Sequence, residues 1–176
     1  IADTINNDPA VSGALTVVFV PNYDVQTAQD LIPAADLSEQ ISMAGTEASG
    51  TGNMKFALNG ALTMGTLDGA NIEIRQAVGA DNIFICGLQA HEIHALRGQG
   101  TYQPREYYAR YPALKRVMDA LYTDRFCPQE PDLFRWIYHA LLDHGDYYCH
   151  LADLPSYIAV QAQVGTAAKN LEPWQK

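Results

Sequence analysis

The sequence predicts an α/β protein, with a mostly parallel sheet covered by helices and then a region of helices alone. Up to about residue 90, short apolar runs alternate with helical patterns, and turn signals separate them. From His91 onward only helical patterns remain. Because strands joined through helices pair in parallel, we expect the first region to build the sheet.

The first region contains segments of both kinds. Residues 15–20 are apolar and β-branched and end at Pro21, which is typical of a strand buried on both faces. Apolar runs at 61–66 and 82–86 predict two further strands. Helical spacing and stop signals predict helices at 25–32, 52–58 and 71–78.

In the second region we expect helices at about 91–97, 104–123, 131–144 and 153–169. Tyrosines crowd this region, and their spacing favours packing between helices over a sugar-binding surface, which stays the alternative. The change of pattern divides one domain into an α/β part, 1–90, and a helical continuation, 91–176.

Composition excludes several classes of protein. The 176 residues are 48% hydrophobic and carry a net charge of −9, so a nucleic-acid or anionic-membrane partner is not expected. No apolar run reaches the length of about 20 residues that spans a bilayer. The three cysteines form no CxxC pair, and His91 and His94 do not make a metal motif, so we expect no metal and a reducing, cytoplasmic setting.

Charge is unevenly distributed along the chain. From residue 1 to 88 there are ten acidic side chains and only two basic ones, Lys55 and Arg75. The only lysine of this half therefore stands inside its most glycine-rich segment, 45–56. A lysine among glycines in an acidic half of the chain suggests a functional role for its charge, and the alternative is an ion pair with a nearby carboxylate.

The glycine-rich segment predicts a phosphate-binding turn. Gly50 and Gly52 allow close approach of a ligand, and Thr51 suits the N-cap of the helix that follows. Unpaired amides at a helix start can hold a phosphate dianion. At the fourth helical position Lys55 is electrostatically disfavoured by about 0.3–1 kcal/mol, which an anionic or covalent partner would offset. The P-loop and GxGxxG motifs are not met here.

Four stretches carry a family resemblance: 34–42, 47–55 (Glu-Ala-Ser-Gly-Thr-Gly-Asn-Met-Lys), 58–63 and 65–73. They resemble the glycogen, starch and maltodextrin phosphorylases, and a looser likeness covers essentially the whole chain. The resemblance implies a partial Rossmann-like, doubly wound parallel sheet from the C-terminal lobe of a two-lobed glycosyltransferase-B type fold. The N-terminal lobe would then be missing, and the full-length enzyme would be a homodimer.

The resemblance also assigns roles to individual residues. It implies that Lys55 forms a Schiff base with pyridoxal 5'-phosphate and that Gly50, Thr51 and Gly52 surround the phosphate of this cofactor, with Lys55 and Thr51 as the catalytic residues. Tyr23 matches a tyrosine that lies against the cofactor. The next position, usually basic in animal members, is Asp24 here.

For the substrate, the resemblance implies that Glu47, Ser49 and Gly50 hold the hydroxyls of the glucosyl unit. The expected reaction is phosphorolysis of terminal α-1,4-glucosidic bonds by inorganic phosphate, giving glucose 1-phosphate with retention. The cofactor phosphate would serve as acid and base, and this chain alone is expected to be inactive. A nucleotide-sugar glycosyltransferase of the same architecture and a noncatalytic α/β interaction domain remain the alternatives.

Overall fold

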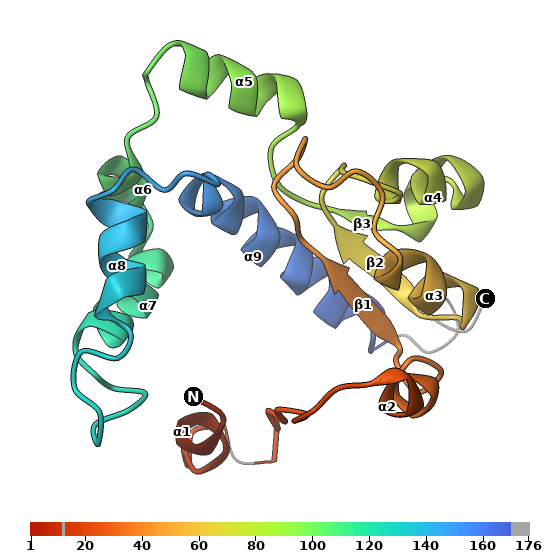
Figure 1. Ribbon diagram of the computed structural model, residues 1–176, viewed down its shortest axis with the longest axis horizontal. Coiled ribbons are helices and arrows are strands. Elements are labelled where there is room, and N and C mark those ends of the chain that lie inside the picture. The colour runs from red at the N-terminus through yellow and green to blue at the C-terminus, as the bar shows by residue number, and fades with distance from the viewer. Residues whose placement is uncertain (12, 170–176) are drawn as a thin grey trace.

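The computed structural model describes residues 1–11 and 13–169 and confirms the α/β class (Figure 1). Its sheet has three parallel strands in the order β1 (Leu37–Gln40), β2 (Leu62–Gly65) and β3 (Phe84–Ile85). The register places Leu37 opposite Leu62 and Met64 opposite Phe84. Each parallel pair is linked through helices, as the alternating sequence pattern predicts.

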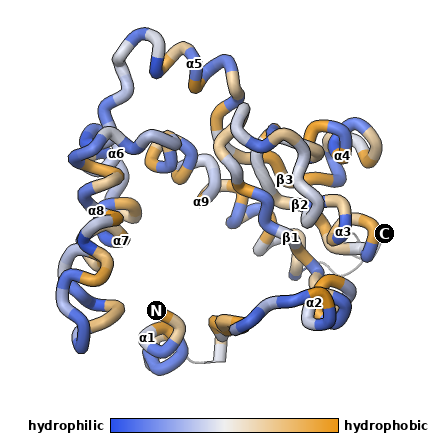
Figure 2. Tube along the Cα trace, in the orientation of Figure 1, coloured by the Kyte–Doolittle hydropathy of each residue, from blue (hydrophilic) through white to orange (hydrophobic). Residues whose placement is uncertain are grey.

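Two of the three expected strands are confirmed, and one is wrong. The runs at 61–66 and 82–86 contain β2 and the short β3. Residues 15–20 form no strand, and the side chains of Val18 and Phe19 are 74% and 82% exposed (orange stretch between α1 and α2 in Figure 2). The described part of the chain offers this segment no neighbouring strand, so its backbone groups cannot join a ladder.

The helices of the first region are short. They are α1 (Ala2–Asn6), α2 (Val25–Leu31), α3 (Gly52–Leu58) and α4 (Asn71–Val78), followed by a 3₁₀ turn at Ala80–Asn82. The last three α-helices confirm the expected helices within one residue at each end. Helix α1 and strand β1 were not predicted; β1 escapes the pattern because its sequence, Leu-Ser-Glu-Gln, contains no apolar run.

The second region is helical, as expected. It contains α5 (Ala90–Gly98), α6 (Pro104–Arg110), α7 (Pro112–Tyr122), α8 (Arg135–Leu142) and α9 (His150–Ala167). The single helix expected over 104–123 is wrong, because Pro112 holds the preceding Tyr111 in an extended conformation and starts a new helix. No described helix is both long and apolar enough to cross a bilayer.

Helices cover both faces of the sheet (Figure 1). On one face Met64 packs with Leu37 and Phe84 against Val160 and Val164 of α9. The opposite face carries buried, small polar side chains such as Ser38 and Thr63, and α3 packs there. This arrangement leaves the start of α3 beside the carboxyl ends of β1 and β2, where ligands commonly bind in open α/β sheets.

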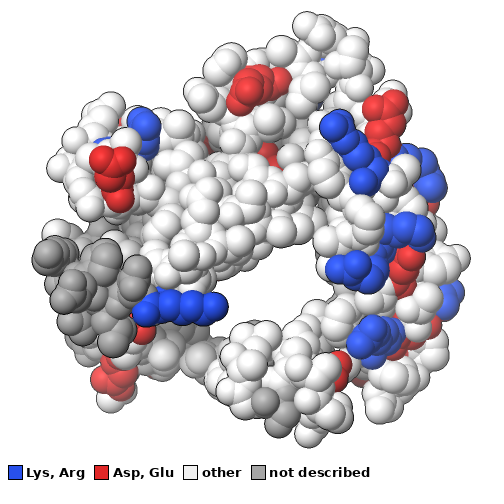
Figure 3. All heavy atoms as spheres, turned by 180° about the vertical axis from the view of Figure 1, so that it is seen from behind, with Lys and Arg blue, Asp and Glu red and all other residues white. Residues whose placement is uncertain are grey.

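Two further apolar clusters lie outside the sheet. One joins Met43 and Ala44 to Ile93 of α5 and to Cys149. The other joins α7, α8 and α9, and Tyr107, Tyr108, Tyr111 and Tyr138 pack against it. The expected packing role of these tyrosines is therefore confirmed. Seen from behind, Lys and Arg side chains gather mainly over the helical region (Figure 3).

Candidate functional site

The segment from Ile41 to Thr51, which we call the site loop, connects β1 to α3 and carries most of the expected site residues. Its first part is anchored by apolar contacts, since Met43 and Ala44 are buried against α5. Its second part returns to the sheet and ends at the first turn of α3. The loop is thus fixed at both ends by packed elements.

Asp68, which follows β2, fixes the site loop by hydrogen bonds. It is only 4% exposed and accepts hydrogen bonds from Ser42 Oγ (2.7 Å) and from the N–H groups of Gly45 (2.8 Å) and Glu47 (2.9 Å). Burial alone would raise the pKa of Asp68, but the bonds from Ser42, Glu47 and Gly45 outweigh it and lower this pKa. The carboxylate is therefore charged at neutral pH and fully engaged with the loop.

Two buried asparagines extend this network to α3 and α4. Asn53 Nδ2 donates to Asn71 Oδ1 (3.1 Å) and to the carbonyl of Ser49 (3.2 Å). Asn71 Nδ2 in turn donates to the carbonyl of Thr66 (3.0 Å). Because both asparagines are buried and bonded, they fix how α3 and α4 sit on the loop.

The turn after β2 leaves no room for a side chain at Gly69. A Cβ there would lie 2.5 Å from the carbonyl oxygen of Ser49 and 3.0 Å from Cγ of Glu47, and the residue has a φ of +50°. The neighbouring Ala70 N–H donates to that same Ser49 carbonyl at 2.7 Å. Close backbone approach therefore requires glycine at this position.

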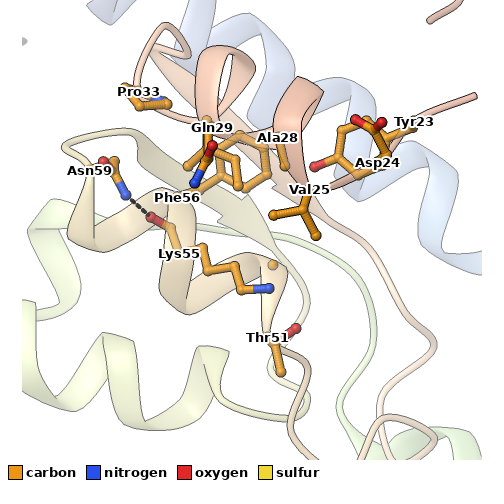
Figure 4. Close-up of a pocket in the computed structure, with 12 residues that line it drawn as sticks. Tyr23, Asp24, Val25, Ala28, Gln29, Pro33, Thr51, Lys55, Phe56 and Asn59 are labelled. Atoms are coloured by element: carbon orange, nitrogen blue, oxygen red, sulfur yellow. Dashed lines mark hydrogen bonds between the residues drawn. The ribbon is translucent and has the colours of Figure 1, made fainter.

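A cavity of about 690 Å³ lies between α2 and α3. Among its lining residues are Tyr23 and Asp24 from the start of α2, Thr51 and Gly52 from the start of α3, and Lys55. In Figure 4 the Lys55 amine and the Thr51 hydroxyl lie on the same side of α3, with Val25 across from them on α2. Four of the expected cofactor residues, namely Tyr23, Thr51, Gly52 and Lys55, are thus brought to one cavity.

The start of α3 offers unpaired donors to this cavity. Among the described residues, the N–H groups of Thr51, Gly52 and Asn53 have no hydrogen-bond acceptor. Thr51 occupies the N-cap position as expected, but its side chain does not cap the helix, so its hydroxyl stays available. Of these three residues, Thr51 and Gly52 line the cavity, so two amides and a hydroxyl beside a lysine fit a phosphate group attached to an aldehyde-bearing ring.

Lys55 is the middle residue of the seven-residue helix α3, and its amine lies on the same side of the helix as Thr51. The electrostatic penalty expected for this amine therefore stays a prediction. Lys55 forms no ion pair within the described ranges, and its amine is exposed to the cavity.

Asp24 stands where the family resemblance leads us to expect a basic residue, and it has a structural role. Its Oδ1 accepts a hydrogen bond from the Thr27 N–H at 2.8 Å and so caps α2. This bond lowers the pKa of Asp24. The side chain therefore fixes the helix that forms the wall of the cavity opposite Lys55.

The residues expected to hold the glucosyl unit lie in the site loop but do not line this cavity. Glu47 Oε1 accepts a bond from the Ser49 N–H at 3.3 Å, and Ser49 Oγ donates to the Gly50 carbonyl at 3.1 Å. Gly50 has a φ of +78°, which turns the chain into α3. The side chains of Glu47 and Ser49 are exposed, next to the cavity rather than within it.

The sequence interpretation missed the residues that hold the site loop. The sequence pattern gives no role to Asp68, and it places Asn53 and Asn71 in expected helices without assigning them a role. The signal that could have found them is a polar side chain directly after a strand or at a helix start in an apolar setting. No group of histidine, cysteine and acidic residues suited to a metal occurs in the described residues, including around His91 and His94.

The sequence of this chain is similar to those of known proteins over its whole length. A family model described as "Carbohydrate phosphorylase" matches residues 1–176. The chain is 50% identical to the brain form of glycogen phosphorylase from Homo sapiens over 176 residues, 49% identical to the human muscle form, and 51% identical over 174 residues to glycogen phosphorylase from Haemophilus influenzae. These alignments cover 99–100% of this chain but 21% of each relative. By the match over its whole length, the chain belongs to the carbohydrate phosphorylase family.

Proposed function

We propose that this chain forms the cofactor-binding part of an α-glucan phosphorylase that uses pyridoxal 5'-phosphate. The observation that carries the proposal is the cavity that Lys55, Thr51 and Tyr23 all line, next to the unpaired amides of Thr51 and Gly52. Family membership supports the reaction class, since the relatives compared are glycogen phosphorylases. Residues 1–90 would hold the cofactor, and 91–176 would support them as a helical continuation.

Each residue has a distinct task in this proposal. The Lys55 amine holds the cofactor by a covalent bond to its aldehyde carbon. The N–H groups of Thr51 and Gly52, with the Thr51 hydroxyl, bind the phosphate group, and Gly50 lets the backbone approach it. Tyr23 covers the ring at the mouth of the cavity. When bound, the cofactor supplies a phosphate whose pKa near 6 suits proton exchange at neutral pH.

The site loop would present the glucosyl unit to that phosphate. Glu47 and Ser49 have exposed polar side chains that can bind sugar hydroxyls, and Asp68 keeps their backbone in place. The substrates would be an α-1,4-glucan and inorganic phosphate, and the product glucose 1-phosphate. A further lobe of the protein, a homodimer and a cytoplasmic location belong to the same proposal.

Reductive labelling tests the cofactor site directly. The chain is mixed with pyridoxal phosphate, reduced with borohydride and digested, and the labelled peptides are mapped. We expect one dominant label at Lys55, its loss in Lys55→Arg, and its retention in Lys115→Arg, which changes an exposed lysine elsewhere. Labels spread evenly over the lysines, or tight binding of a nucleotide sugar in place of the cofactor, would overturn the assignment.

Activity of the isolated chain is a second test. We expect the 176 residues alone to release no glucose 1-phosphate from glycogen and phosphate. The reason is charge. The reaction would bring inorganic phosphate close to the cofactor phosphate, and two anions side by side need cations around them. Apart from Lys55, the first 88 residues contain one cation, Arg75. Measurable turnover that disappears in Lys55→Arg would show that this chain needs no further cations.

A further inference from the structure

A second cavity, of about 260 Å³, lies between the site loop and α5. One wall is the first part of the site loop, Met43–Thr46. The opposite wall is α5, which contributes His94 and Arg97, and Tyr147 closes one side. None of the proposed cofactor or glucosyl residues lines it, so the cavity is separate from the site described above.

The charges around this cavity are unusual for the protein. The chain has 20 acidic and 11 basic side chains, yet no carboxylate from residues 1–11 or 13–169 lines the cavity. Its ionisable lining groups are His94, Arg97 and the phenol of Tyr147. Asp146, which precedes Tyr147, is buried and does not line the cavity; its Oδ2 accepts from Tyr102 and from the Leu151 N–H, and its Oδ1 has no partner among the described residues. The cavity is thus a cationic hollow on an acidic molecule.

Arg97 is positioned without being neutralised. Its guanidinium carbon lies 4.1 Å from the centre of the Tyr147 ring. Within the described ranges neither Arg97 nor His94 has an acidic partner. The contact with the ring holds the guanidinium group in place, and its N–H groups, which have no acceptor among the described residues, can donate to the oxygens of a tetrahedral anion. His94 lies one helical turn before Arg97 and can add a further N–H donor.

We propose that this cavity binds a small oxyanion of the phosphate class through Arg97 and His94. The ligand is inorganic phosphate or the phosphate group of a phosphorylated sugar, whose ring would rest beside Tyr147. Because Gly45 and Thr46 also line the cavity, the bound anion contacts the site loop, which contains the expected glucosyl residues. Binding here does not depend on the proposed cofactor chemistry.

The test follows phosphate binding to the 176-residue chain by NMR, at ionic strength held constant with sodium chloride. We expect amide shifts at Gly45, Thr46 and Ala90. Arg97→Gln should weaken phosphate binding at least tenfold and His94→Gln about threefold, in line with the loss of a charged and a lesser donor. Arg110→Gln is the matched control, since Arg110 also stacks on a tyrosine, Tyr111, at 5.6 Å.

Parallel titrations separate the two sources of the anion. Equal binding of phosphate and sulfate, with no gain for a hexose 1-phosphate, identifies the free oxyanion as the ligand. A tenfold preference for the hexose 1-phosphate identifies the phosphorylated sugar. Unchanged binding in Arg97→Gln, an equal loss in Arg110→Gln, or shifts confined to Thr51 and Gly52 would overturn the inference. The last result would place the anion in the cofactor cavity instead.

Discussion

Asp68 and Asp146 are both buried carboxylates, 4% and 1% exposed, and both fix a turn, but they are bonded differently. Asp68 uses both oxygens and accepts three bonds from the site loop. Asp146 accepts from Tyr102 and Leu151 through Oδ2, while its Oδ1 has no partner in the described part of the chain. The carboxylate beside the proposed site is thus the better satisfied, which indicates that the site loop is held rigidly.

Removing the Asp68 carboxylate should have the largest effect. Asp68→Ala leaves the Gly45 and Glu47 N–H groups and the Ser42 hydroxyl without their acceptor, and we expect a loss of about 4 kcal/mol in the free energy of unfolding. Urea denaturation measures it, and Asp81→Ala, at an exposed position, is the control. A loss below about 1 kcal/mol would remove the distinction between the two aspartates.

Adding a side chain at Gly69, where the turn after β2 contacts the site loop, should lower the free energy of unfolding somewhat less. In Gly69→Ala the new Cβ meets the Ser49 carbonyl and requires a left-handed backbone, so we expect a loss of about 3 kcal/mol and weaker labelling of Lys55. Gly60→Ala is a matched control, because Gly60 also has a positive φ but nothing within 4 Å of a Cβ. It should lose about 1 kcal/mol and label normally. Equal effects at both glycines would mean that backbone strain alone matters.

Removing one hydrogen-bond donor to Asp146 should lower the free energy of unfolding less than the changes at Asp68 and Gly69. Tyr102→Phe removes the 2.6 Å bond to Oδ2 but leaves the bond from the Leu151 N–H. We expect a loss of about 1–2 kcal/mol, with labelling of Lys55 unchanged. Tyr148→Phe, whose hydroxyl has no bond among the described residues, should be neutral in the same denaturation assay. A loss as large as that of Asp68→Ala would abolish the difference between the two turns.

The pH dependence of Asp68 should be the smallest effect. Its pKa is lower in the folded chain than the ordinary 3.8, so its contribution to stability is present above that value and falls as pH drops through the folded pKa. Between pH 5 and pH 3 the wild-type chain should therefore lose more stability than Asp68→Ala. Parallel curves for the two proteins would show that another group titrates there.

The turn and the helix around Lys55 could be predicted because their signals are local. Glycines and a residue suited to the N-cap position within one short segment predict a turn followed by a helix, and both are present. The phosphate-binding role of this segment stays a prediction, and Tyr23 lines the same cavity as Lys55. The strand expected at 15–20 failed for the opposite reason. Strand formation depends on a neighbour supplied by distant chain, and β-branched composition cannot reveal whether that neighbour is present.

The polar β1 and the Asp68 network were missed for a related reason. Leu37–Gln40 becomes a strand because β2 accepts it in register, not because of its own apolar pattern. Asp68 gains its role from residues more than 20 positions away, Ser42, Gly45 and Glu47. Contacts of this range are set by the fold, and the sequence pattern of a short window does not contain them.

Helix α9 connects the sheet to the helical region. Residues at or within it belong to all three apolar clusters: Cys149 and Ala152 pack with α5, Leu151 and Leu154 with α7 and α8, and Val160 and Val164 with the sheet. If either the sheet or the helical region unfolded, apolar side chains of α9 would become exposed to water. The sheet and the helical region should therefore melt together, as one cooperative transition in the calorimeter.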